Sequence, residues 1–104
     1  MRRGDVWWAE LPAPAGRHPV VLLSRNEAYT LRELVTVAPI TTRVRRIPTE
    51  VELGRRDGLP KRCVANLDTI TTIPKRTLTG QIARLVPKKV AAVDAALRFA
   101  LGLR

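Results

Sequence analysis

The sequence has 104 residues, with 19 Lys or Arg against 9 Asp or Glu, and therefore a net charge of +10 at pH 7. This length supports one small domain, residues 1–104, and excludes a two-domain enzyme. No apolar run is long enough for a membrane helix, and the N-terminus lacks the apolar stretch of a secretory signal, so we expect a cytoplasmic protein that does not enter a membrane.

Six segments are predicted to form short strands, because each is rich in apolar, β-branched or aromatic residues and is bounded by Pro, Gly, Asn or charged residues. They are residues 5–11, 19–24, 34–40, 49–53, 62–70 and 78–85. Residues 20–23 are apolar without alternation, which predicts a central strand covered on both faces. Residues 50–53 alternate between acidic and apolar types, which predicts an edge strand. The close spacing of the segments favours a compact barrel.

Two segments depart from a simple alternating pattern. Within 62–70 the apolar residues change from one face to the other, which predicts a β-bulge near Asp68 and Thr69. Residues 26–33 have the composition of a short helix, with Asn26 as its N-terminal cap.

The C-terminal segment has a helical period. Apolar residues recur every three or four positions across residues 87–101, with Pro87 suited to the first turn and Gly102 to the end. We therefore expect one helix that packs its apolar stripe on the barrel. Asp94 and Arg98 are spaced to form an ion pair on its exposed face.

The positive charge lies within the folded body, because residues 41–62 hold seven basic side chains and three acidic ones. The simplest partner is a polyanion, either a nucleic acid or an acidic protein segment. The alternative is a charged surface that only keeps the domain soluble. The side chains predicted to contact backbone phosphates are Arg43, Arg45, Arg46, Lys61 and Arg62.

Several chemistries have no signature in the sequence. It contains no glycine-rich phosphate loop, zinc-ligand spacing or nucleophile elbow. Cys63 and His18 are each the only residue of their kind, so we expect no metal site and no cofactor. What remains is a set of polar residues at predicted strand ends, which a closed barrel would bring to one rim. These are Arg17 and His18, Thr41 and Thr42, and Asn66 with Asp68.

The order of several segments resembles one known family. MRRGDVWWAEL is followed by HPVVLLSRN, VTVAPITT, TEVEL, CVANLDTITTIPKRTL and a terminal segment that ends in LGL. This order is similar to that of the MazF/PemK/Kid toxin endoribonucleases, over almost the whole chain. The resemblance implies a mainly β fold, an SH3-like antiparallel β-barrel with a C-terminal α-helix of the CcdB/PemK type. It also implies a homodimer whose groove binds single-stranded RNA, and an acidic MazE-like antitoxin whose C-terminal segment fills the same groove.

The family's metal-independent, sequence-specific cleavage uses the neighbouring 2′-hydroxyl as nucleophile and leaves 2′,3′-cyclic phosphate and 5′-hydroxyl ends. The protein must then transfer protons and stabilise charge on the phosphate. Family members usually carry Arg directly before the Pro of the second strand, whereas this sequence has His18 there and Arg17 one residue earlier. We expect His18 to transfer the proton and Arg17 to stabilise charge. The alternative is that both belong to a solvated loop.

Two further catalytic residues follow from the resemblance. Thr41 matches the Thr of the family's P-[IV]-T turn and is expected to bond the scissile phosphate, although Thr is also an ordinary strand residue. Asp68 stands where several members have an acidic residue proposed as general base; its alternative role is to pair with an Arg. The family run Q-I-R-T-[IV]-D is altered at 69–74, where its Arg and Asp are absent. Other expected RNA contacts are Thr42, Asn66, Thr69 and Thr71.

The two adjacent tryptophans, Trp7 and Trp8, must face opposite sides of one strand, so one is expected in the core and the other on the surface or at a dimer interface. Two other functions remain open. One is an RNA-binding barrel without catalysis, and the other is a CcdB-like toxin that acts on DNA gyrase by protein contact.

Overall fold

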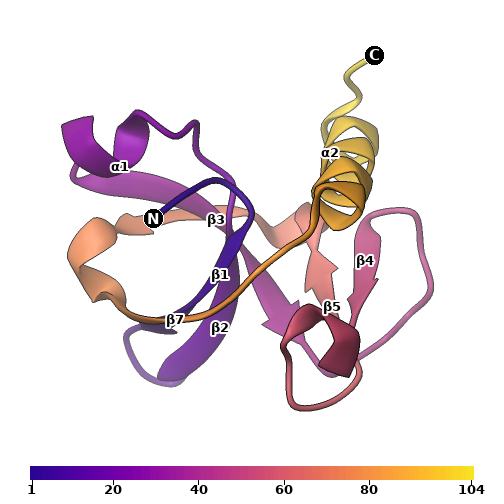
Figure 1. Ribbon diagram of the computed structural model, residues 1–104, viewed down its shortest axis with the longest axis horizontal. Coiled ribbons are helices and arrows are strands. Elements are labelled where there is room, and N and C mark those ends of the chain that lie inside the picture. The colour runs from indigo at the N-terminus through magenta and orange to yellow at the C-terminus, as the bar shows by residue number, and fades with distance from the viewer.

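The computed structural model describes residues 1–104 and consists of a curved antiparallel sheet with a C-terminal helix (Figure 1). The strands are β1 (Asp5–Glu10), β2 (Arg17–Leu22), β3 (Leu34–Thr41), β4 (Glu50–Leu53), β5 (Cys63–Asn66), β6 (Thr71–Pro74) and β7 (Leu78–Arg84). The helices are α1 (Ala28–Leu31) and α2 (Pro87–Leu101), with the 3₁₀ turns η1 (Arg55–Asp57), η2 (Leu67–Thr69) and η3 (Lys75–Thr77). Neither α-helix is long and apolar enough to cross a lipid bilayer.

β3 is the strand that joins the two parts of the sheet. The strand order is β4-β5-β3-β2-β1-β7, and β6 also pairs with β3. The first half of β3 pairs with β6, its middle with β2, and its last residues, Ile40 and Thr41, pair with β5. The sheet has a barrel-like form but does not close, because β4 and β7 remain its two ends. The end of β3 is therefore the point where the two parts of the sheet meet.

Two hydrophobic cores lie on opposite faces of the central strands. Strand alternation explains the division, because Val21 belongs to the first core while Val20 and Leu22 belong to the second. Helix α2 covers the first core with Val93 and Ala96. The prediction of a central strand covered on both faces is confirmed, and so is the predicted span of the C-terminal helix.

The prediction of one bulged strand over 62–70 is wrong. β5 ends at Asn66, whose side-chain oxygen accepts a hydrogen bond from the Asp68 backbone N–H at 2.9 Å. This local bond competes with the strand ladder and starts the turn η2, so the change of face near Thr69 is a turn and not a β-bulge. Residues 71–74 then form a separate strand, β6, which the sequence did not predict.

Two local contacts also differ from the sequence prediction. The helix expected over 26–33 is only the four residues of α1, and Asn26 does not cap it. The Asn26 side-chain oxygen instead accepts a bond from the Arg3 backbone N–H at 2.7 Å. Asp94 pairs with the Arg3 side chain at 2.7 Å and not with Arg98, so the N-terminus is fastened to α2.

Asp5 is a fully buried carboxylate that joins β1 to β7. It accepts bonds from the Arg84 side chain at 2.7 Å and from the Arg2 backbone N–H at 2.9 Å. Burial by itself raises the pKa of Asp5, but the bonds from Arg84 and Arg2 outweigh it and hold that pKa below its ordinary value. The charged form therefore stabilises the fold.

Gly58 allows the loop between β4 and β5 to lie against β7. Its φ is +92°, and a Cβ at this position would lie 2.7 Å from the Cβ of Ala83. Only glycine avoids both the left-handed strain and this clash. The close approach places Leu59 and Lys61, which follow in the same loop, beside the sheet.

Candidate active site

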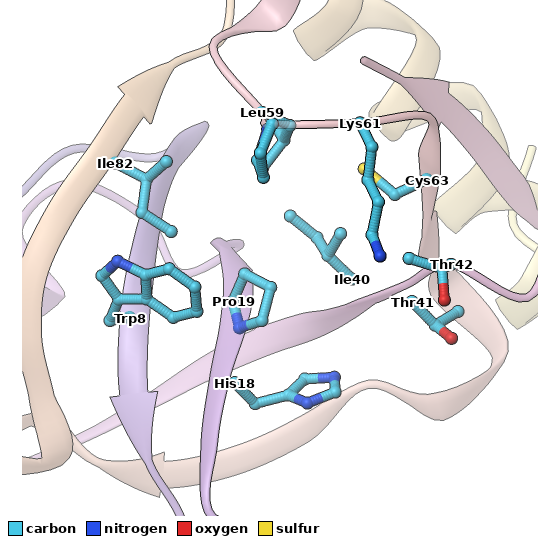
Figure 2. A pocket seen from close by; sticks show the side chains of 11 residues that line it. Trp8, His18, Pro19, Ile40, Thr41, Thr42, Leu59, Lys61, Cys63 and Ile82 are labelled. Carbon is cyan, nitrogen blue, oxygen red and sulfur yellow. The ribbon is translucent and has the colours of Figure 1, made fainter. Parts of the chain in front are cut away.

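A cavity of about 290 Å³ opens between the β1–β2 hairpin, the end of β3 and the loop that precedes β5 (Figure 2). We call it the apolar cavity, because most of its walls are hydrophobic. The apolar walls come from Trp8, Pro19, Ile40, Leu59, Cys63 and Ile82. Its polar side chains are His18, Thr41, Thr42 and Lys61.

A second pocket of about 200 Å³ adjoins the first. We call it the polar pocket, and it is lined by Pro39, Thr41, Arg43, Arg45, Asn66 and Thr69. Thr41, the last residue of β3, lines both spaces and so forms the wall between them. Its hydroxyl accepts a bond from the Arg43 backbone N–H at 3.2 Å, which orients it. A group bound at Thr41 would face an apolar cavity on one side and two guanidinium groups on the other.

His18 lines the apolar cavity, whereas its neighbour Arg17 is not part of the lining and stacks on Trp8, one of the wall residues. The β1–β2 register pairs Arg17 with Glu10, so Arg17 shares a face with Trp8. Its guanidinium carbon lies 4.3 Å from the Trp8 ring centroid, and its Nε lies 3.7 Å from a Glu10 carboxylate oxygen. His18 lines the cavity, and Figure 2 shows its imidazole on the side where Thr41 lies. The imidazole therefore faces the cavity, and the guanidinium is connected to it through the Trp8 ring.

Asp68 lies next to this arrangement, on the turn η2 between Asn66 and Thr69. Its carboxylate accepts a bond from the Thr49 hydroxyl at 2.6 Å and forms no ion pair with an Arg. It lines neither pocket, whereas its neighbours on the turn line the polar one. No group of three or more His, Cys, Asp or Glu side chains is placed to hold a metal ion.

Residues 2–101 match the family model described as PemK-like, MazF-like toxin of type II toxin-antitoxin system. The chain belongs to this toxin family. The predicted fold, an antiparallel barrel-like sheet with a C-terminal helix, is confirmed by the solved structures that resemble it.

Several relatives of this PemK/MazF-like toxin come from mycobacteria. The probable endoribonuclease MazF5 of Mycobacterium tuberculosis is 38% identical over 100 residues, which cover 95% of this chain and 91% of that protein. The structure of Mycobacterium tuberculosis toxin MazF-mt6 matches with a TM-score of 0.88 at 34% identity and covers 96% of this chain and 98% of that one. The structure of a mycobacterial endoribonuclease in complex with its cognate antitoxin matches with a TM-score of 0.87 at 30% identity, and the match covers 100% of this chain and 97% of that one.

The side chains that the sequence assigned to RNA contact fall into three groups in this toxin. Thr42 and Lys61 line the apolar cavity, and Arg43, Arg45, Asn66 and Thr69 line the polar pocket. Three others, Arg46, Arg62 and Thr71, line neither.

These three have other surroundings. Arg62 forms an ion pair with Glu52 at 2.7 Å, and this hydrogen-bonded partner holds the pKa of the Glu52 carboxyl below its ordinary value. The backbone N–H of Arg46 donates to a Glu50 carboxylate oxygen at 3.0 Å, which fixes the loop that precedes β4. Thr71 is exposed on β6.

The sequence did not identify the apolar walls of the toxin's cavity. Leu59 and Ile82 are distant in the chain and have the pattern of ordinary core residues. The one available signal was the Trp pair of β1. Trp7 packs against the second core, and Trp8 faces the cavity, which is consistent with the expected division between core and surface.

Proposed function

We propose that this protein is the endoribonuclease of a type II toxin–antitoxin pair and that it cleaves single-stranded RNA at specific sequences without a metal. One observation carries the proposal: Thr41 separates a cavity that contains His18 from a pocket that contains Arg43 and Arg45. The family match and the relative named as a probable endoribonuclease support it.

The scissile phosphate would lie at Thr41, whose hydroxyl donates to a phosphate oxygen. The neighbouring phosphate would enter the polar pocket, where Arg43 and Arg45 neutralise its charge. The substrate's 2′-oxygen then attacks phosphorus, and the bond to the 5′-oxygen breaks. His18 accepts the proton of the 2′-hydroxyl, and the departing 5′-oxygen takes up a proton from solvent water. The products are a 2′,3′-cyclic phosphate and a 5′-hydroxyl end.

Arg17 would stabilise the negative charge that develops on the phosphate. A guanidinium stays protonated, so it supplies charge and hydrogen bonds and does not accept the proton. The Trp8 ring and Glu10 already hold it beside the cavity. In this arrangement the adjacent residues Arg17 and His18 of β2 share the work that a single Arg directly before the Pro does in the usual family sequence.

We assign Asp68 to holding the turn η2. Its carboxylate is occupied by the Thr49 hydroxyl, while Asn66 and Thr69 on the same turn face the polar pocket. Asp68 therefore acts through those two side chains. This differs from the general-base role that the resemblance implied.

The partners follow from charge and from the relatives. The net charge of +10 suits both RNA and an acidic antitoxin. A related mycobacterial endoribonuclease has been solved with its cognate antitoxin. We propose that this toxin is a cytoplasmic homodimer that an acidic antitoxin neutralises.

The test is to incubate the protein with a long single-stranded RNA in EDTA and to map the fragment ends. Discrete cuts with 5′-hydroxyl ends support the proposal. RNA that is retained without cuts would indicate an RNA-binding barrel instead, and intact RNA together with trapped gyrase complexes would indicate a gyrase poison.

Two variants test the assigned roles. His18→Ala is expected to lower the cleavage rate by roughly 100-fold or more, the usual contribution of a general acid or base. Arg17→Ala is expected to act on the same step. The matched control is Arg56→Ala, which removes an exposed charge that lines neither pocket. Equal rates for His18→Ala and the control would remove His18 from the mechanism.

A further inference from the structure

We propose that the apolar cavity binds one unstacked nucleobase of the substrate and that Lys61 selects guanine or uracil there, through guanine O6 or uracil O4. This inference rests on the proposed function, and it names a specificity-determining residue for that reaction. It also changes the role of Lys61, which the sequence assigned to a backbone phosphate.

The chemistry of the walls favours a base over a phosphate. Trp8, Ile40 and Leu59 present an aromatic ring and aliphatic side chains to the space, whose volume of about 290 Å³ is close to that of small ligand sites. A phosphate would lose its hydration against such walls at a high cost. A base has apolar faces, and proteins that read single-stranded RNA stack splayed bases on aromatic rings. The adjoining polar pocket is the better phosphate site.

Lys61 is the free charged group at this cavity. Figure 2 shows its ammonium extending into the space between Ile40 and Thr42. Lys61 takes part in none of the ion pairs or side-chain hydrogen bonds of the structure, whereas the next residue, Arg62, is paired with Glu52 at 2.7 Å. The Lys61 ammonium therefore remains available to a ligand.

An ammonium is a donor without an acceptor, and this property selects among bases. Guanine O6 and uracil O4 accept a bond from it, whereas adenine and cytosine carry an amino group at the same ring position, which meets the ammonium as a second donor. The pocket is therefore expected to favour guanine or uracil and to reject adenine. Since Thr41 lines both spaces, the selected base is adjacent to the scissile phosphate.

The first experiment compares cleavage motifs. The wild-type protein, Lys61→Met and Arg56→Met are each given an RNA library with random sequence, and the bases around every cut are counted. The wild type is expected to reject adenine at one position next to the cut. Lys61→Met is expected to weaken that rejection about tenfold or more, which corresponds to one base-edge contact. Arg56→Met removes an exposed charge outside the cavity and is expected to keep the motif.

The second experiment does not depend on cleavage. In a Trp7→Phe background Trp8 is the only tryptophan, so its fluorescence reports stacking in the cavity. Oligonucleotides made non-cleavable by 2′-deoxy substitution at the cut are expected to quench it more strongly with guanine or uracil at the selected position than with adenine. Lys61→Met is expected to remove the difference.

Three results would overturn the inference. They are an unchanged motif in Lys61→Met, adenine preferred at the position next to the cut, and quenching that does not depend on the base. An unchanged motif combined with weaker antitoxin binding would assign the cavity to the antitoxin. A wild-type protein that cuts no RNA contradicts the proposed function, whereas base-dependent quenching would still support the pocket.

Discussion

Gly58→Ala is expected to destabilise the fold and to disturb the cavity at the same time. The substitution adds one methyl group to a residue with φ of +92°, at a point where the β4–β5 loop meets β7. The new Cβ would lie 2.7 Å from the Cβ of Ala83, a separation that two carbon atoms do not tolerate. Either the loop or the strand must move, and the loop carries Leu59 and Lys61 into the cavity.

The magnitude has two parts. The left-handed backbone costs an L-residue about 1–2 kcal/mol. Overpacking of a well-packed contact costs about 1–3 kcal/mol more. Together they give about 2–5 kcal/mol, and each kcal/mol lowers the midpoint of a domain of this size by roughly 4–8 °C. A fall in Tm of at least about 8 °C is therefore expected.

Thermal unfolding followed by circular dichroism measures this shift, and the chain supplies a matched control. Gly16 also has a positive φ, +62°, but a Cβ there would meet nothing within 4 Å. Gly16→Ala should therefore show the backbone strain alone. Ala83→Gly in the Gly58→Ala background should recover part of the loss, as a double-mutant cycle would show. Equal Tm shifts for the two alanine variants, with no recovery in the double variant, would refute the reasoning.

Three further outcomes are expected. Asp5→Asn should lower the free energy of unfolding by about 1.5–3 kcal/mol, because it removes the charged partner of Arg84. The bonds to Asp5 hold its pKa below the ordinary value, so the stability that the charged Asp5 contributes is present above about pH 4 and is lost as the pH falls further. Urea titrations at several pH values should therefore show this loss in the wild type and not in Asp5→Asn. Burial raises the pKa of Tyr29, the only tyrosine, to about 12. The stability that the neutral Tyr29 side chain contributes is therefore present below about pH 10 and is lost as the pH rises through about 12. Absorbance titration near pH 10 should show no phenolate. Asp68→Asn should keep RNA cleavage within about tenfold, since an amide oxygen still accepts the Thr49 hydroxyl; a loss of roughly 100-fold with RNA binding intact would make Asp68 the general base.

Local sequence pattern was sufficient for most of the fold. The central strand around Val21 and the helix over 87–101 were predictable. A continuous apolar run and a helical period are both visible in a short stretch of consecutive residues. The segment after β5 was not predictable in the same way. There the hydrogen bond from the Asp68 backbone N–H to the Asn66 side chain ends β5. Pairing with β3 then makes the Thr-rich residues 71–74 a further strand, β6.

The candidate site was predictable in residue type and only partly in arrangement. Arg17, His18 and Thr41 could be selected as polar residues at strand ends. Lys61 and Arg62 looked alike in the sequence, yet one extends into the cavity and the other pairs with Glu52 on the neighbouring strand. That difference depends on the β4–β5 pairing, which no local pattern specifies.

Because Thr41 stands at the end of a strand held by β2 and β5, the distance between the two pockets is set by the sheet and not by the surrounding loops. The loops can therefore change in sequence and alter which nucleotides are accepted. The scissile bond stays at the same distance from the recognised nucleotides. A toxin built this way can acquire new targets without rebuilding its chemistry.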